Sequence, residues 1–237
     1  MIAMNGGDGG ILAVRIESGL VAGTPTTEVT RALRRAVMAR VQRAIGPHRL
    51  LPAFFSGHEP DGSPLKRATS PHLAFVFDPV REFLLVIAPH LLERREATQQ
   101  ERQHLHVLDE ALAGFHDLRA GRAGRLCLEP VLLDPERDPL LTPSHVWESV
   151  TPYQVTRHAK SSSAAAALTE NLLAEGRRVG LPTPRVSVLR AKGVREVGLV
   201  GEVRLKFRKA VPGPVLLGKT RYLGGGLFAS RNDGPEA

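Results

Sequence analysis

The order of apolar patterns in the first 133 residues limits the possible fold more than any other feature of this chain. Residues 11–17, ILAVRIE, form an apolar run typical of a buried strand. A turn follows, and apolar residues then recur at steps of four from Val29 to Ile45, which predicts a long helix capped by Thr26 or Thr27. The elements predicted after it are strands at 72–78 and 82–88, a helix at 98–118 and a strand at 125–133.

Strand, helix, strand, strand, helix, strand is the order of a ferredoxin-like unit, so residues 11–133 are predicted to form one. The proline-rich segment 134–145 is interpreted as a linker. Residues 146–230 begin the same plan again, with a strand at 146–156, a helix at 161–178 and strands at 185–190 and 197–209. Its second helix is missing or reduced to the turn at 211–214. The predicted fold class is α+β, with two ferredoxin-like domains in tandem and the second degenerate.

Several classes of protein are disfavoured by composition. The single cysteine, Cys127, excludes an internal disulfide and a thiolate zinc cluster. Asp134, Glu136 and Asp138 lie among prolines and are interpreted as turn formers rather than metal ligands. No cofactor and no metal site are therefore predicted. No apolar run approaches the roughly 20 residues that span a bilayer, so we expect a cytoplasmic protein without a membrane partner.

Charge is distributed unevenly along the chain. The net charge is +8, but residues 1–150 hold 17 Lys/Arg against 18 Asp/Glu, whereas residues 151–237 hold 15 against 6. An excess confined to one part of a chain usually faces a polyanion. No amphipathic helix carries these basic residues, so nucleic acid is favoured over a membrane surface.

A basic strand is the first candidate for that contact. The segment 203–209, VRLKFRK, alternates strictly, so Arg204, Lys206 and Arg208 are predicted to share one face of the strand. Cations at intervals of about 7 Å suit an RNA backbone. A solvated edge strand protected by charge explains the pattern equally well.

A glycine-rich segment near the end is the second candidate. In residues 218–226, GKTRYLGGG, the backbone of Gly218 and of Gly224, Gly225 and Gly226 could approach phosphate closely, with Lys219 and Arg221 adding charge. The order of residues differs from that of a nucleotide-binding P-loop. A glycine-rich hairpin is the alternative interpretation.

Two histidines stand out from the nine in the chain. His58 lies in a polar loop without apolar periodicity, and His72 opens a predicted strand. Histidine is the side chain best suited to proton transfer near neutral pH, although a lone loop histidine is usually only solvated. His104 and His106 are two apart on a helix and therefore point in different directions, and His90, His116 and His145 have no partner at a useful spacing.

Four motifs occur in an order that resembles one family. They are SGHEPDGSP at 56–64, SPHLAF at 70–75, WESVTPY at 147–153 with RHAK at 157–160, and GKTRYLGGGLF at 218–228. Together they resemble the repeat-processing (Cas-six) portion of the CRISPR-associated subunit of type I-U, also called I-G, systems. The resemblance covers residues 11–230. The spacing of the glycine loop departs from the family's usual pattern.

That resemblance implies a RAMP protein that cleaves CRISPR repeat RNA without a metal and leaves a 2′,3′-cyclic phosphate. It implies CRISPR repeat and guide RNA, and other subunits of a CRISPR effector complex, as partners. In the family this portion is typically fused behind a second RAMP domain that caps the 5′ handle, so we expect a stand-alone version or a fragment.

The mechanism expected from these residues needs a base, an acid and cations. His58 is the first candidate for the base, and His72 is the reserve or the acid. Lys66, Arg67 and Arg221 are candidates for charge stabilisation, and Arg157 and Lys160 are expected to bind RNA. His48 and His158 are further candidates if neither histidine acts. A non-catalytic RAMP scaffold subunit and an unrelated basic module that binds DNA are the alternative functions.

Overall fold

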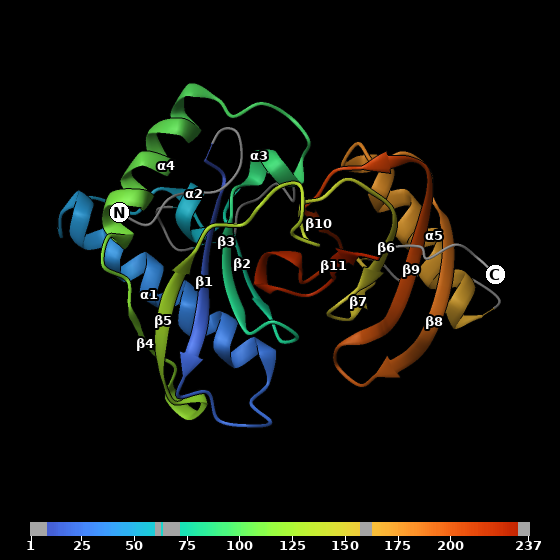
Figure 1. The fold of residues 1–237 in the computed structure, drawn as a ribbon, viewed down its shortest axis with the longest axis horizontal. Coiled ribbons are helices and arrows are strands. Elements are labelled where there is room, and N and C mark those ends of the chain that lie inside the picture. Colours follow the sequence, from blue (N-terminus) through green and yellow to red (C-terminus); the bar gives the residue numbers. More distant parts are fainter. Residues whose placement is uncertain (1–8, 60–62, 64–71, 157–162, 232–237) are drawn as a thin grey trace. The chain divides into compact units, whose positions relative to one another are not determined.

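A computed structural model of the chain describes residues 9–59, 63, 72–156 and 163–231. It is an α+β protein with antiparallel sheets, as predicted (Figure 1). The chain divides into two compact units. Met1–Leu91 and Arg95–Leu132 form the first, and Leu92–Arg94 and Leu133–Ala237 form the second.

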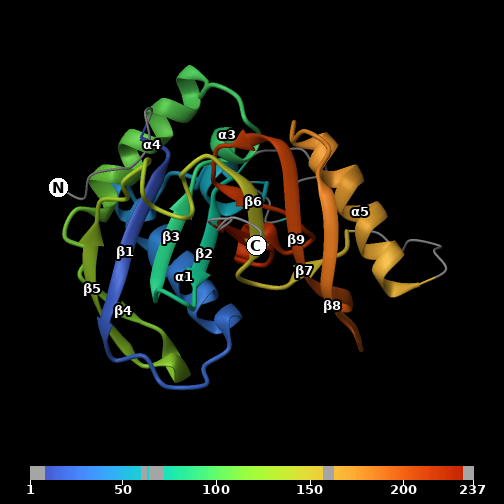
Figure 2. The same cartoon turned by 45° about the vertical axis from the view of Figure 1, so that its right-hand side comes forward.

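The first unit contains one five-stranded sheet with the order β2-β3-β1-β5-β4. Its strands are β1 (Ile11–Ser18), β2 (Ala74–Asp78), β3 (Phe83–Ile87), β4 (Asp117–Arg119) and β5 (Arg125–Val131). Its helices are α1 (Thr26–Ile45), α2 (Ala53–Ser56) and α4 (Gln99–Leu112), with a 3₁₀ turn, η1, at Gly121–Ala123. The short helix α3 (Pro89–Leu92) also belongs to it, except for its last residue. The apolar stripes of α1 and α4 pack with β1 in one core, so both helices cover the same face of the sheet (Figure 2).

The first unit contains β4, α2 and α3 in addition to the predicted elements, and both long helices differ from the prediction at one end. Helix α1 begins at Thr26, but its N-cap is Pro25 and no side chain caps it, so the predicted threonine cap is wrong. Helix α4 ends at Leu112 instead of continuing to 118, because the backbone leaves the helical conformation at Ala113 (ψ 125°) and the left-handed Gly114 (φ 71°) then turns the chain toward β4. Phe115 and Leu118 continue the apolar spacing and are buried, so the stripe alone does not mark where the helix ends.

The second unit contains a sheet with the order β10-β11-β6-β9-β7, and β8 pairs with β9. Its strands are β6 (Ser144–Ser149), β7 (Tyr153–Gln154), β8 (Arg185–Val194), β9 (Gly198–Val211), β10 (Val215–Leu216) and β11 (Leu227–Ser230). Helix α5 (Ala164–Arg178) packs on this sheet through Leu168 and Leu172. Between β9 and β11, all of which is described, the only helical segment is the 3₁₀ turn η2 (Arg221–Leu223).

The segment interpreted as a linker packs into the second unit. Leu140 and Leu141 are buried, and Leu141 accepts a hydrogen bond from the N–H of Gly213 at 3.0 Å. Its acidic residues do form turns, as predicted. The carboxylate of Asp134 accepts from the N–H of Glu136, and that of Asp138 accepts from the N–H of Leu140. Across the described residues, the structure has no helix both long and apolar enough to cross a membrane.

Candidate functional site

His58 is held at the end of α2 by the carbonyl of Ser56. Gly57 ends α2 in a left-handed conformation (φ 69°), and this tight turn brings the His58 ring back to the helix end. His58 Nδ1 lies 2.9 Å from Ser56 O, and Arg34 of α1 donates to the same oxygen from Nη2. The Arg34 Nη2 atom also lies 3.2 Å from His58 Nδ1.

The shorter of the two contacts of Nδ1 favours one tautomer of the His58 ring. Ser56 O can only accept a hydrogen bond, so the short contact to Nδ1 requires a proton on Nδ1. Arg34 can only donate, so its longer contact of 3.2 Å would need Nδ1 as the acceptor, and we assign the tautomer from the shorter contact to Ser56 O. In the neutral ring the lone pair is then on Nε2, for which the described residues provide no hydrogen-bond partner. A histidine whose Nδ1–H is held by a backbone carbonyl is oriented to accept a proton at Nε2.

His72 packs against the turn that carries His58. A Cβ atom placed on Gly57 would lie only 2.8 Å from His72 Nε2, so the ring covers this glycine. The two segments are tied together by a hydrogen bond from Leu73 N–H to Phe54 O at 2.9 Å. The structure therefore brings both predicted histidines to Gly57, although they are separated by a loop.

An open groove of about 340 Å³ lies beside His58. It is lined by Arg34, Met38, Leu50, Leu51, Ser56, His58 and Glu59. Burial lowers the pKa of Arg34, but an arginine stays charged at physiological pH. The groove thus combines an oriented imidazole with a fixed cation. Lys66 and Arg67, predicted to contribute further charge, lie outside the described residues, as do Arg157 and Lys160.

The basic strand has the predicted alternation. Arg204, Lys206 and Arg208, here called the β9 cation row, are exposed on one face of β9. The residues between and before them, Val203, Leu205 and Phe207, are buried in the core of the second unit. Arg204 is partly neutralised, because its Nη2 lies 2.8 Å from Glu148 Oε2 on β6.

The tertiary structure adds basic residues to this face that the sequence did not reveal. Arg185 of β8 lies directly opposite Lys206 in the antiparallel register, and both are exposed. Arg190 follows on the same strand and pairs with Glu202 at 3.4 Å. The β9 row is therefore part of a two-strand basic surface.

A second groove, of about 550 Å³, borders one end of this surface. It is lined by Pro143, Ser144, His145, Val146, Lys206, Phe207, Arg208 and Arg231. His145 lies where the register between β6 and β9 shifts, and its Nδ1 is 3.2 Å from Phe207 O. His145 has no useful partner along the sequence, and only the pairing of β6 with β9 brings Lys206 and Arg208 to it.

The glycine-rich segment is closed by its own hydrogen bonds. The N–H groups of Gly218, Gly224, Gly225 and Gly226 donate to Glu175, Arg221 O, Thr220 O and Pro152 O, respectively. A Cβ atom on Gly226 would lie 1.7 Å from Leu217 O, so close backbone packing requires this glycine. These amides already have acceptors, which conflicts with the prediction that they contact phosphate. Lys219 remains exposed.

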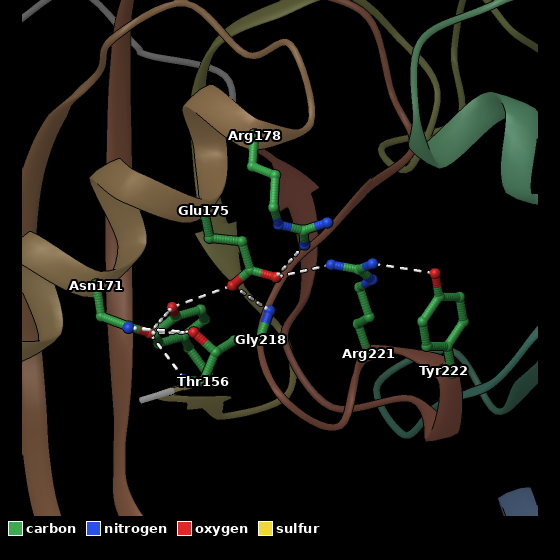
Figure 3. Close-up of polar contacts among 8 residues, drawn as sticks. Thr156, Asn171, Glu175, Arg178, Gly218, Arg221 and Tyr222 are labelled. Atoms are coloured by element: carbon green, nitrogen blue, oxygen red, sulfur yellow. Dashed lines mark hydrogen bonds and ion pairs between the residues drawn. The ribbon is translucent and has the colours of Figure 1, made fainter. Parts of the chain in front are cut away.

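Arg221 also differs from its predicted role. Its side chain is 8% exposed, and Nη1 lies 2.9 Å from Glu175 Oε1 of α5 (Figure 3). Glu175 Oε2 accepts the Gly218 N–H at 2.8 Å and lies 3.1 Å from the Tyr153 hydroxyl. Burial and the neighbouring Glu175 raise the pKa of Tyr153, which keeps that hydroxyl protonated. Arg221 therefore anchors the loop to α5 instead of presenting its charge to RNA.

Comparisons with known proteins do not assign the chain to a family. No family model matches the sequence, and no curated protein matches it significantly. Among the described residues, no group of three or more His, Cys, Asp or Glu side chains is arranged to hold a metal ion.

Proposed function

We propose that this protein is an endoribonuclease that cleaves CRISPR repeat RNA through side-chain acid–base chemistry, without a metal ion. The observation that carries the proposal is the His58 site, in which a carbonyl orients the ring, a cation lies beside it and a second histidine packs on the same turn. These are the groups that RNA transesterification requires.

The proposed step moves one proton at each end of the reaction. Nε2 of His58 takes the proton of the ribose 2′-OH, and the 2′-oxygen attacks the adjacent phosphorus. The bond from phosphorus to the 5′-oxygen breaks, and protonated His72 gives its proton to that oxygen. The products are a 2′,3′-cyclic phosphate and a 5′-OH end. Arg34 stabilises the charge that develops on the phosphorane.

The strand order supports the proposed RAMP architecture. Across the sheet of the first unit, β5, β1, β3 and β2 are neighbours in this order. They correspond to the fourth, first, third and second strands of a β-α-β-β-α-β unit. In the second unit β11-β6-β9-β8 repeat this order, with η2 where a second helix would stand. We therefore propose two ferredoxin-like halves, the second degenerate.

The basic surface of β8 and β9 is proposed to bind the phosphate backbone of the same RNA. Its cations are exposed and arise from neighbouring strands, as recognition by backbone rather than by base stacking requires. Retention of the guide RNA and association with other CRISPR effector subunits belong to this proposal.

His58→Ala tests the catalytic assignment. Single-turnover cleavage of a repeat RNA in excess EDTA should fall by a factor of about 10² to 10⁴, because that is the usual contribution of a general base. RNA affinity should stay within a few-fold of the parent, since the base acts in the transition state. His106→Ala is the matched control, because His106 is an exposed histidine on α4.

The same experiment separates the alternatives. A parent protein that cuts only when magnesium is restored would overturn the metal-free mechanism. RNA binding without cleavage under any condition would favour a RAMP scaffold subunit, for which the basic surface alone suffices. Stronger binding to DNA than to repeat RNA would favour an unrelated basic module.

A further inference from the structure

A third groove lies on the first unit, between α1 and the edge strand β4. Its volume is about 340 Å³, and it is lined by Ala32, Arg35, Ala36, Ala39, Arg40, Arg43, Phe115, Asp117, Leu118 and Arg119. The groove forms beside Ala32, Ala36 and Ala39, because these short side chains on successive turns of α1 leave space next to the helix. Four arginines and one aspartate are the charged residues of the lining.

The charge of this groove is largely uncompensated. Among the described residues, no ion pair is found for Arg35, Arg43 or Arg119. The one acid, Asp117, already interacts with Arg125 at 3.5 Å. Arg125 lies directly opposite Arg119 in the β4–β5 register, so Asp117 is the one acid beside two arginines.

One arginine is held in place by packing. The Arg40 guanidinium lies over the Phe115 ring, 5.0 Å from its centroid. This contact fixes the planar donor group and reduces the entropy lost on binding. A guanidinium presents its donors in a fork that matches phosphate oxygens.

We propose that this groove, which we call the α1–β4 groove, binds the phosphodiester backbone of RNA. Arg35 and Arg43 are eight residues apart on α1, a span of about 12 Å, so they can contact different phosphates of one strand. The net charge of the first 150 residues is nearly zero and gives no sign of the groove, because all acidic residues that balance these arginines, apart from Asp117, lie outside its lining. The inference rests on the proposed function, since it names a second contact region for the same RNA.

The test is the triple variant Arg35→Gln, Arg43→Gln and Arg119→Gln in the full chain, which leaves Arg40 on Phe115. Losing three phosphate contacts should lower the slope of log affinity against log salt by about 2, at about 0.7 per contact for single-stranded RNA. At 0.15 M salt this corresponds to affinity weaker by about 50-fold. The matched control replaces Arg31, Arg49 and Arg122, which are exposed arginines of the same unit outside the groove.

Each outcome decides between the proposals. A lower slope in the groove variant, with the control variant unchanged, supports the groove. Equal slopes for both variants, in a protein that binds RNA, overturn the groove and leave the proposed function standing. A parent protein without salt-dependent RNA binding overturns the proposed function and the groove with it. Loss of polyglutamate binding in the groove variant, without loss of RNA binding, assigns the groove to an acidic protein instead.

Discussion

Replacing Glu175 should destabilise the second unit, because this carboxylate joins α5 to the glycine-rich loop. It is 2% exposed and lies 2.9 Å from Arg221 Nη1 and 2.8 Å from the Gly218 nitrogen. Glu175→Ala would leave the Arg221 guanidinium buried without its carboxylate. Removing one partner of a buried ion pair typically costs about 3 to 5 kcal/mol, more than the net strength of the pair itself.

The loss of stability can be measured in the full chain with a signal that comes from the second unit. The single tryptophan of the chain, Trp147, is fully buried in the core of this unit, so its fluorescence reports the unfolding of that core. In urea, Glu175→Ala should lower the free energy of unfolding by about 3 to 5 kcal/mol. The same loss would lower the melting temperature by about 6 to 20 °C for a chain of this size. Glu170→Ala is the control, because Glu170 is exposed on the same helix and carries the same charge.

A double-mutant cycle identifies the cause of the loss. If the unpaired guanidinium is responsible, Arg221→Met should cost much less in the Glu175→Ala background than in the parent. A loss below about 1 kcal/mol for Glu175→Ala would refute the reasoning, and so would additive effects of the two substitutions. The first result would mean that the close backbone packing of the glycines holds the loop without the carboxylate. The second would mean that Glu175 acts through Gly218 and Tyr153 and not through Arg221.

Two further predictions concern the basic surface and the response to acid. Changing the three cations of the β9 row to glutamine should lower the salt slope of RNA binding by about 1.4 to 2, as two or three contacts predict, and an unchanged slope would assign the row to edge protection. Burial would raise the pKa of Glu101, but hydrogen bonds from Arg95 and from the backbone of Thr98 lower it to about 2. Because this pKa is depressed by folding, the stability it contributes is present above about pH 4.5 and is lost as the pH falls toward 2. Urea titrations across that range should show a shallower decline for Glu101→Gln, and equal declines would contradict the assignment.

The sequence by itself determined the elements in which apolar residues recur with a clear helical or strand periodicity. Helix α1 and strands β1 and β9 lie where their apolar patterns predict, because side-chain periodicity directly decides which face meets the core. The exposed β9 row follows from the same rule. Element ends were less predictable: the apolar stripe of α4 continues into Phe115, although the backbone leaves the helix at Ala113 and turns at Gly114.

Tertiary structure alone decided which polar residues meet. Glu175 and Arg221 are distant in sequence, and burial made an anchor of an arginine that charge alone suggested for RNA. His145 meets Lys206 and Arg208 through strand pairing, and the α1 arginines form a groove with Arg119 because β4 lies at the sheet edge beside α1. Periodicity depends on neighbours along the chain, whereas these sites depend on register and packing between segments that a sequence pattern does not encode.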